Sequence, residues 1–190
     1  MRRNSTAICL LLFFLLYGCA HPKDSSTEQQ IRIATLAAAL HALSPDASEQ
    51  ESRDFASVAI NTAANLREQY QVSAAPWIHN IEVNSGIKPR GLCFHYANDL
   101  AIKLVPLTSP HWQLYLVQAK PKQLLEHNAI VIAGTEKPWQ SGIVLDGWRD
   151  SGVLYFAPVM QDKYPWQLKN KIKNKTNQNP EITTLDHPES

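Results

Sequence analysis

The sequence predicts an α+β domain with its helices in the first part of the chain and an antiparallel sheet in the second. Two observations indicate this order. Apolar residues recur at helical spacing between residues 26 and 104, and four short runs of strand character follow between residues 112 and 156. Helices that precede the strands, rather than alternating with them, are typical of an α+β domain. We therefore expect a single domain over residues 28–166.

Two helices are expected first. Ser26 with Gln29, and Ser48 with Glu51, have the spacing of a capping box, in which two side chains satisfy free backbone donors at the helix start. An apolar stripe follows each box. The stripes are Ile33, Leu36, Ala37 and Leu40 in the first helix and Phe55, Val58, Ala59, Thr62, Leu66 and Tyr70 in the second. Both indicate ordinary packing faces, and the following segment, Pro76 to Pro89, is predicted to be a mixed connector.

A third helix is expected to begin near Leu92 and to end at Pro106, because proline cannot continue a helix. Its apolar stripe contains Cys93, Tyr96, Ala97, Leu100 and Leu104. Strand-like runs then predict strands at Trp112–Gln118, Asn128–Ala133, Ile143–Trp148 and Val153–Phe156. These strands are expected to form an antiparallel sheet against which the helix of Cys93 packs. From Gln167 hydrophobic residues become scarce, which predicts a disordered polar tail over residues 167–190.

The first 19 residues have the features of an export signal. Arg2 and Arg3 give a positive start, residues 7–17 form an almost unbroken apolar run, and a glycine precedes Cys19. The run is too short to cross a bilayer as a helix, which takes about 20 residues. The tetrapeptide Leu16-Tyr17-Gly18-Cys19 resembles the lipobox of bacterial lipoproteins, in which the cysteine is acylated and becomes the N-terminus. The alternative is an ordinary signal peptide with an incidental cysteine.

The lipobox resemblance implies a lipid anchor. Residues 1–18 would be removed as a signal peptide, and residues 19–27 would hold lipidated Cys19 and a polar tether to the bilayer. Several acyl chains bind a membrane almost irreversibly, because each buried methylene contributes about 0.8 kcal/mol. Ala20 stands where an inner-membrane retention signal places aspartate. By the same resemblance we expect the cell envelope, at an outer membrane and facing the periplasm.

Charge and cysteine content narrow the class of protein further. Loss of Arg2 and Arg3 leaves 16 basic against 17 acidic residues, a net charge of −1, which gives no electrostatic reason to expect a nucleic-acid partner. Cys9 lies in the signal and Cys19 in the lipobox, so Cys93 is the single cysteine left. An exported chain with one free thiol cannot form an internal disulfide, and the thiol therefore needs another explanation.

Cys93 is expected in the first turn of the third helix, because turn residues Pro89 and Gly91 come just before it. Free backbone N–H groups and the positive end of the helix dipole stabilise a thiolate there, and the thiolate is the nucleophilic form. The same N–H groups could receive an oxyanion. The alternative is that Cys93 serves as a small core residue on the packing face of its helix.

A thiol nucleophile needs a base and a group that orients the base. His127 opens the second strand run and Asp146 lies near the end of the third. If these runs pair as a hairpin, a register of 127 with 146 or of 127 with 148 puts both side chains on one face of the sheet. Ala129, Val131 and Ala133 share that face and leave room for a packed helix. Aspartate is a poor strand residue, so Asp146 calls for a role such as holding an imidazole.

Three other histidines are alternatives. His111, at a strand start, is a credible base without an acid on a neighbouring strand, His95 lies on another side of the helix from Cys93, and His79 lies in the connector. A zinc site from Cys93 and His95 is disfavoured, because ligands two residues apart on a helix do not converge. We therefore expect neither a metal nor another cofactor.

The order of Cys93 at a helix start, His127 at a strand start and Asp146 on the next strand resembles the papain-like superfamily, particularly its transglutaminase-like branch. The string Val-Leu-Asp-Gly-Trp at residues 144–148 resembles the Asp-Pro-Trp segment of that branch, with glycine in place of proline. This resemblance implies a papain-like fold in which Cys93 is the nucleophile, His127 the base and Asp146 the orienting acid. Residues 79–166 also resemble uncharacterised proteobacterial lipoproteins.

Papain-like enzymes place a glutamine before the cysteine to complete the oxyanion hole, and no glutamine lies between Gln71 and Cys93. Asn80 or Asn84 could donate instead. The resemblance implies a membrane-anchored thiol hydrolase or acyl transferase that acts on amide bonds. The expected location makes peptidoglycan peptides or envelope proteins the expected substrates. The alternative is a non-catalytic lipoprotein that serves as a binding or assembly module.

Overall fold

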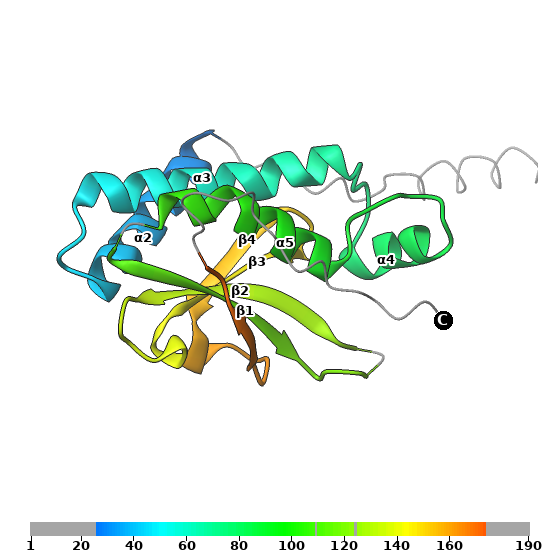
Figure 1. The fold of residues 1–190 in the computed structure, drawn as a ribbon. Helices are drawn as coiled ribbons and strands as arrows, with labels where there is room; N and C mark the ends of the chain where they lie inside the picture. The colour runs from blue at the N-terminus through cyan, green and yellow to red at the C-terminus, as the bar shows by residue number, and fades with distance from the viewer. Residues whose placement is uncertain (1–25, 109, 124, 174–190) are drawn as a thin grey trace, which may run out of the picture.

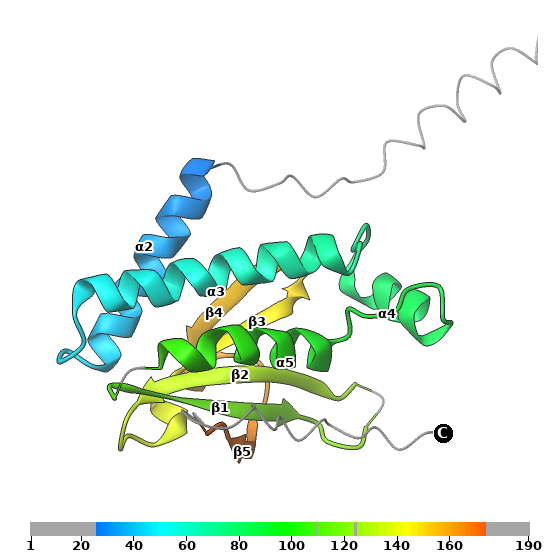
Figure 2. The same ribbon diagram turned by 45° about the horizontal axis from the view of Figure 1, so that its top comes forward.

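The computed structural model describes residues 26–108, 110–123 and 125–173 (Figure 1). Within these ranges the chain forms helices that lie on one side of an antiparallel sheet (Figure 2). The α+β class expected from the sequence is therefore confirmed. The predicted signal peptide at residues 1–18, the lipidation site Cys19 and most of the tether lie outside the described residues, as does the tail from residue 174.

Three of the four longer helices were expected from the sequence. The helices are α2 (Ser26–Leu43), α3 (Glu49–Gln69), α4 (Pro76–Asn84) and α5 (Cys93–Leu104), with short 3-10 helices η2 (Val105–Leu107), η3 (Trp139–Ser141) and η4 (Val159–Gln161). The capping box of Ser48 and Glu51 is present at the start of α3. In α2, Gln29 donates a hydrogen bond to Asn61 of α3 over 2.6 Å, which ties the two helices together.

The prediction of a connector between Pro76 and Pro89 is wrong for its first nine residues, which form α4. Pro76 is the first residue of this helix, where proline is favoured because its ring fixes a helical φ and its missing N–H needs no partner. The preference of proline for a helix start explains why a helix begins here.

The sheet contains the four expected strands, with bounds that differ by at most two residues, and one more. Its strands are β1 (Trp112–Ala119), β2 (His127–Gly134), β3 (Ile143–Asp150), β4 (Val153–Pro158) and β5 (Gln167–Lys171), in the order β4-β3-β2-β1-β5 with antiparallel pairing. The prediction of a disordered tail from Gln167 is wrong for β5, which pairs with β1 at the edge of the sheet. An exposed edge strand tolerates polar side chains, so a polar composition did not exclude it.

The main core lies between the helices and one face of the sheet. Tyr96 and Leu100 of α5 belong to the same buried cluster as Ile130, Ile132 and Leu145 of the central strands. In both views of the ribbon α5 runs along β2 beneath α3 (Figures 1 and 2).

The opposite face of the sheet carries a smaller buried cluster. Ala129, Val131 and Val144 pack there against Val159 and Trp166 from the C-terminal segment. The expectation that a helix covers the face of Ala129, Val131 and Ala133 is therefore wrong. Residues of the other parity are the larger ones, and they face the helices because they bury more apolar surface. Within the described residues no helix is both long and apolar enough to cross a bilayer.

Candidate active site

The N-terminal tip of α5 is held by two histidines. The Nδ1 atom of His95 accepts hydrogen bonds from the backbone N–H groups of Gly91 (3.1 Å) and Leu92 (3.2 Å), so His95 caps the helix. His79 is buried and its Nε2 donates to the Arg90 carbonyl over 2.9 Å. Gly91 has a φ of +124°, and a Cβ added there would lie 2.1 Å from His79 Nε2. Only glycine at position 91 therefore allows the backbone to lie this close to His79.

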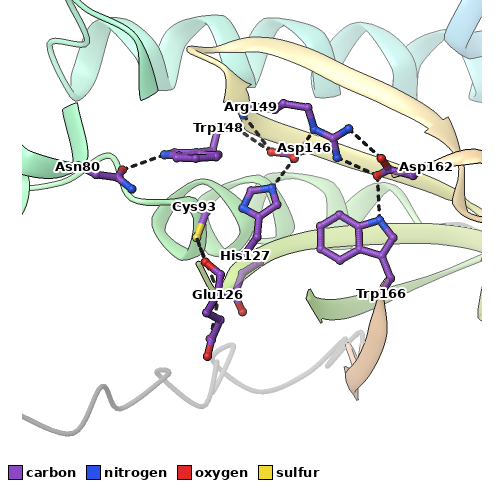
Figure 3. A network of polar contacts seen from close by, with 10 residues as sticks. Asn80, Cys93, Glu126, His127, Asp146, Trp148, Arg149, Asp162 and Trp166 are labelled. Atoms are coloured by element: carbon purple, nitrogen blue, oxygen red, sulfur yellow. Dashed lines mark hydrogen bonds and ion pairs between the residues drawn. The ribbon is translucent and has the colours of Figure 1, made fainter. Parts of the chain in front are cut away.

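These contacts place Cys93 as the first residue of α5, next to the start of β2. Its thiol donates a long hydrogen bond to the Glu126 carbonyl, and the Asn128 amide donates one to the sulfur, both at 3.9 Å (Figure 3). The predicted position of Cys93 at a helix tip is confirmed.

Cys93 can reach Glu126 and Asn128 because β2 and β3 are not paired at this end of the sheet. Their ladder ends where Ile130 lies opposite Leu145, short of both His127 and Asp146. Beyond that point α5 packs across β3 at Gly147, where a Cβ would come within 2.8 Å of the Tyr96 ring. The helix tip thus reaches the start of β2 even though the body of α5 lies on the opposite face from His127.

His127 and Asp146 are joined as expected. The pairing of Ile130 with Leu145 continues to a register of 127 with 148, so the two residues are diagonal neighbours on one face. His127 Nε2 donates to Asp146 Oδ2 over 2.6 Å, and both side chains are buried (Figure 3). The sequence therefore predicted correctly that His127 and Asp146 share one face of the sheet. Of the two registers it allowed, the structure has that of 127 with 148.

Every acceptor position of the Asp146 carboxylate faces a donor. Oδ1 accepts from the backbone N–H groups of Trp148 (3.0 Å) and Arg149 (3.2 Å). Oδ2 accepts from His127 and from Arg149 Nε (3.1 Å). Burial raises the pKa of Asp146, but its hydrogen bond to His127 and the positive charges of His127 and Arg149 outweigh that effect and bring the pKa below its usual value. Asp146 is therefore an anion fixed in one orientation.

The second nitrogen of His127 is oriented toward Cys93. Nδ1 is buried and makes no well-formed hydrogen bond, and Figure 3 shows it on the side of the ring that faces Cys93. Burial lowers the pKa of His127, but interactions with Asp146 and Cys93 outweigh this and raise it to about 9. The thiol and the imidazole are thus adjacent without a closed hydrogen bond, as is common in catalytic sites without substrate. This arrangement can pass a proton from sulfur to Nδ1 while Asp146 holds Nε2.

A ring of aromatic side chains encloses the imidazole, and the sequence analysis did not assign it a role. Trp148, Tyr164 and Trp166 lie with ring centroids 4.9, 4.7 and 5.4 Å from that of His127. They come from β3 and from the segment before β5, so residues far apart in sequence meet here. Tryptophans are usually core or rim residues, so their presence in the sequence did not point to this site.

Arg149 and Asp162 are further residues that sequence reasoning missed. Arg149 Nη1 and Nη2 donate to the two oxygens of Asp162 over 2.8 and 2.7 Å, and Trp166 Nε1 donates to Asp162 Oδ2 over 2.8 Å. Arg149 therefore links Asp146 to the segment that carries the aromatic residues (Figure 3). The position of Arg149 three residues after an unusual strand aspartate was the available signal, but its second partner is 13 residues away in an irregular segment.

The two asparagines proposed as oxyanion donors lie differently. Asn80, in the middle of α4, accepts a hydrogen bond from Trp148 Nε1 over 2.9 Å, which fixes its amide beside the site (Figure 3). Asn84 is exposed at the C-terminal end of α4, one helical turn farther along. The structure brings Asn80, and not Asn84, into the polar network around His127.

The alternative histidines have other surroundings. His79 and His95 support the tip of α5, as described above. His111 precedes Trp112, which pairs with Gly134 at the far end of β2 from His127, roughly 23 Å along the strand. No group of three or more His, Cys, Asp or Glu side chains among the described residues could hold a metal ion.

Comparisons of the chain with protein-family models, with curated proteins and with solved structures find no match.

Proposed function

We propose that the protein is a membrane-anchored thiol hydrolase or acyl transferase that acts on amide bonds through Cys93, His127 and Asp146. The observation that carries this proposal is the buried His127, whose Nε2 is fixed by Asp146 at 2.6 Å and whose unpartnered Nδ1 lies beside the Cys93 sulfur. A base held by an acid and aimed at a thiol is the arrangement that nucleophilic catalysis requires.

The reaction proceeds in two steps, formation of a thioester on Cys93 and its breakdown. The Cys93 sulfur attacks the carbonyl carbon with its proton already transferred to His127 Nδ1, and the protonated His127 then gives that proton to the departing amine as the C–N bond breaks. The product of this step is a thioester on Cys93. Water, or an amine acceptor in the case of transfer, then attacks the thioester while the neutral His127 takes its proton, and the Cys93 sulfur leaves as a thiolate beside the reprotonated His127.

The oxyanion formed in each step needs hydrogen-bond donors. The backbone N–H of Cys93 lies at the positive end of α5, and the amide group of Asn80 stands beside the site with its oxygen already engaged by Trp148. That engagement leaves the amide nitrogen of Asn80 as the end able to donate. We assign the second donor role to Asn80 rather than Asn84.

The resemblance of residues 16–19 to a lipobox supports a location at a membrane of the cell envelope, with the domain facing the periplasm. The substrates expected there are peptidoglycan peptides or the side-chain amides of envelope proteins. The contacts of the enzyme with the bilayer are then made through acylated Cys19.

A thiol-directed activity probe, such as a chloroacetamide, tests the proposal on the mature protein. Labelling at neutral pH is expected in the wild type, and is expected to vanish in Cys93→Ala and to fall at least tenfold in His127→Ala, because general-base assistance contributes about 10²–10⁴-fold. His111→Ala is the matched control and should label as the wild type does. Labelling that survives in Cys93→Ala, or that is the same in His127→Ala, removes the proposal.

A second function is favoured by one observation. Cys93 is only 9% exposed and His127 is buried, as expected if the site were a structural remnant within a binding or assembly module of the envelope. In that case the rate of Cys93 alkylation would rise with pH as for an ordinary thiol. A rate already high and nearly constant between pH 6 and 8 favours the enzyme, because His127, with a pKa of about 9, stays protonated beside the sulfur throughout that range.

A further inference from the structure

The end of the domain that carries Cys93 is unusually rich in exposed apolar side chains. Half of the large hydrophobic residues that are exposed in the described ranges lie in two segments, α4 with its following turn and the β1–β2 connection. They are between 60% and 70% exposed, and we call them the apolar rim: Trp77, Ile81, Ile87 and Leu125. Figures 1 and 2 both place these two segments at the same end of the molecule, beyond the tip of α5.

The apolar rim is connected directly to the candidate site. On α4, Asn80 lies between the positions of Trp77 and Ile81 and accepts the hydrogen bond from Trp148. On the other segment, Leu125 precedes Glu126, whose carbonyl accepts from the Cys93 thiol. Both parts of the rim therefore border the residues that surround the sulfur.

The composition of this end fits a lipid surface. Trp77 and Ile81 are four residues apart and share one face of α4. Lys120 and Lys122 lie close to Leu125 in the sequence, and neither is buried. Tryptophan and aliphatic residues beside lysines are typical of segments that lie in the interface of an anionic bilayer.

The length of the tether brings the domain close to such a surface. Seven residue steps separate Cys19 from Ser26, the first residue of α2, and they span at most about 25 Å. A domain of this size is roughly 40 Å across. If Cys19 is acylated, the domain is held so near the bilayer that one of its faces rests against lipid.

We propose that the apolar rim is a membrane-contact surface, which lays the Cys93 end of the domain on the bilayer that holds Cys19. This inference rests on the lipid anchor of the proposed function. It adds that the substrate is an amide presented at the membrane surface, since the segments that border the sulfur face the lipid.

Quenching of tryptophan fluorescence by brominated lipids tests the surface in the lipidated full-length mature protein. The protein is reconstituted into vesicles of phosphatidylethanolamine and phosphatidylglycerol, with and without brominated acyl chains. Trp112 and Trp166 are buried, whereas Trp77 is exposed, so the difference between the wild type and Trp77→Phe isolates the signal of Trp77. We expect a quenched component in the wild type that is missing in Trp77→Phe. Equal quenching in the two proteins overturns the proposal.

A matched pair of variants tests the location of the surface. Ile81→Glu places a charge on the rim and is expected to remove about half or more of the Trp77 quenching, because a charge facing lipid is unfavourable. Ile31→Glu makes the same change at an isoleucine of equal exposure, 61% against 60%, on α2. It should leave the quenching unchanged. An equal effect of the two variants contradicts the assignment of the surface to α4.

The outcomes separate this surface from the proposed function. Cys93→Ala is expected to keep the Trp77 quenching, so loss of thiol chemistry and loss of lipid contact are independent results. If the protein is acylated but Trp77 is not quenched, the apolar rim is not a membrane-contact surface, whereas the lipid anchor of the proposed function still holds. An unacylated protein that still shows quenching, removed by Ile81→Glu, supports the surface and overturns the anchor.

Discussion

Replacement of Asp146 by asparagine is the sharpest test of how His127 is held. The carboxylate accepts two hydrogen bonds on each oxygen, from His127 and Arg149 Nε on one side and from two backbone N–H groups on the other. An asparagine has one acceptor oxygen, so its NH₂ group must face one of these pairs of donors. If the amide oxygen keeps the backbone bonds, His127 has to turn its Nε2 lone pair toward the NH₂ group, and its proton moves to Nδ1.

The contacts of His127 determine how far its pKa should fall in Asp146→Asn. His127 has a pKa of about 9 because its interactions with Asp146 and Cys93 outweigh its burial. Without the charge of Asp146, burial favours the neutral ring, so the pKa should fall to or below the ordinary value of 6.5. A difference of about 2.5 pH units corresponds to about 3 kcal/mol of preference for the imidazolium form. At neutral pH the variant ring is then largely uncharged, with the wrong nitrogen protonated.

Two measurements check this expectation. The pKa of His127 is read from an NMR titration of labelled histidine, and the rate of Cys93 alkylation is measured at pH 7. Asp146→Asn should lower the pKa below 7 and slow alkylation at least tenfold. Asp46→Asn, the same change at an exposed position between α2 and α3, is the control and should change neither. A pKa near 9 in Asp146→Asn would refute the account of how His127 is charged.

Three further outcomes are expected. The free energy of unfolding should fall by up to about 3 kcal/mol as the pH rises from 6.5 to 9, because only the folded chain keeps the His127 proton in that range. Calorimetry at several pH values should show this decrease in the wild type and not in His127→Gln. In urea unfolding, Gly91→Ala should cost more than about 2 kcal/mol, since its Cβ would overlap His79, whereas Gly86→Ala, with a positive φ and open space, should cost about 1–2 kcal/mol. His111→Ala should leave the pH dependence of Cys93 alkylation unchanged, and a shifted profile would reinstate His111 as the base.

The fold could be read from the sequence wherever one periodicity held over a whole element. The stripes predicted for α2 and α5 are buried as expected, and the central strands were identified. The α3 stripe was only partly right: Val58 and Thr62 are partly exposed, and the buried residues Ala56, Ile60 and Ala63 were not in it. The helix α4 and the strand β5 were not predicted from the sequence, for a common physical reason. β5 is exposed along its whole length and α4 buries only His79, so neither has an apolar stripe to recognise. Tertiary contacts define them instead: β5 pairs with β1, and α4 is fixed through buried His79.

The site was predictable where local rules applied. The position of Cys93 followed from the turn residues before it, and the pairing of His127 with Asp146 followed from strand parity. Which face α5 covers did not follow, because alternation along β2 gives two apolar faces and only their relative bulk separates them. Arg149, Asp162 and the aromatic ring were missed because they come together through an irregular segment whose path no pattern records.

The position of His127 on the face opposite α5 has a consequence for how the site is assembled. The helix supplies the sulfur only by passing the gap beyond the last pair of the β2–β3 ladder, while the imidazole is covered from the other side by the segment that leads into β5. Arg149 pairs with both Asp162 of that segment and Asp146, so one chain of ion pairs runs from the segment to the carboxylate that holds His127. The position of the segment that leads into β5 is therefore coupled, through Asp162 and Arg149, to the orientation of Asp146.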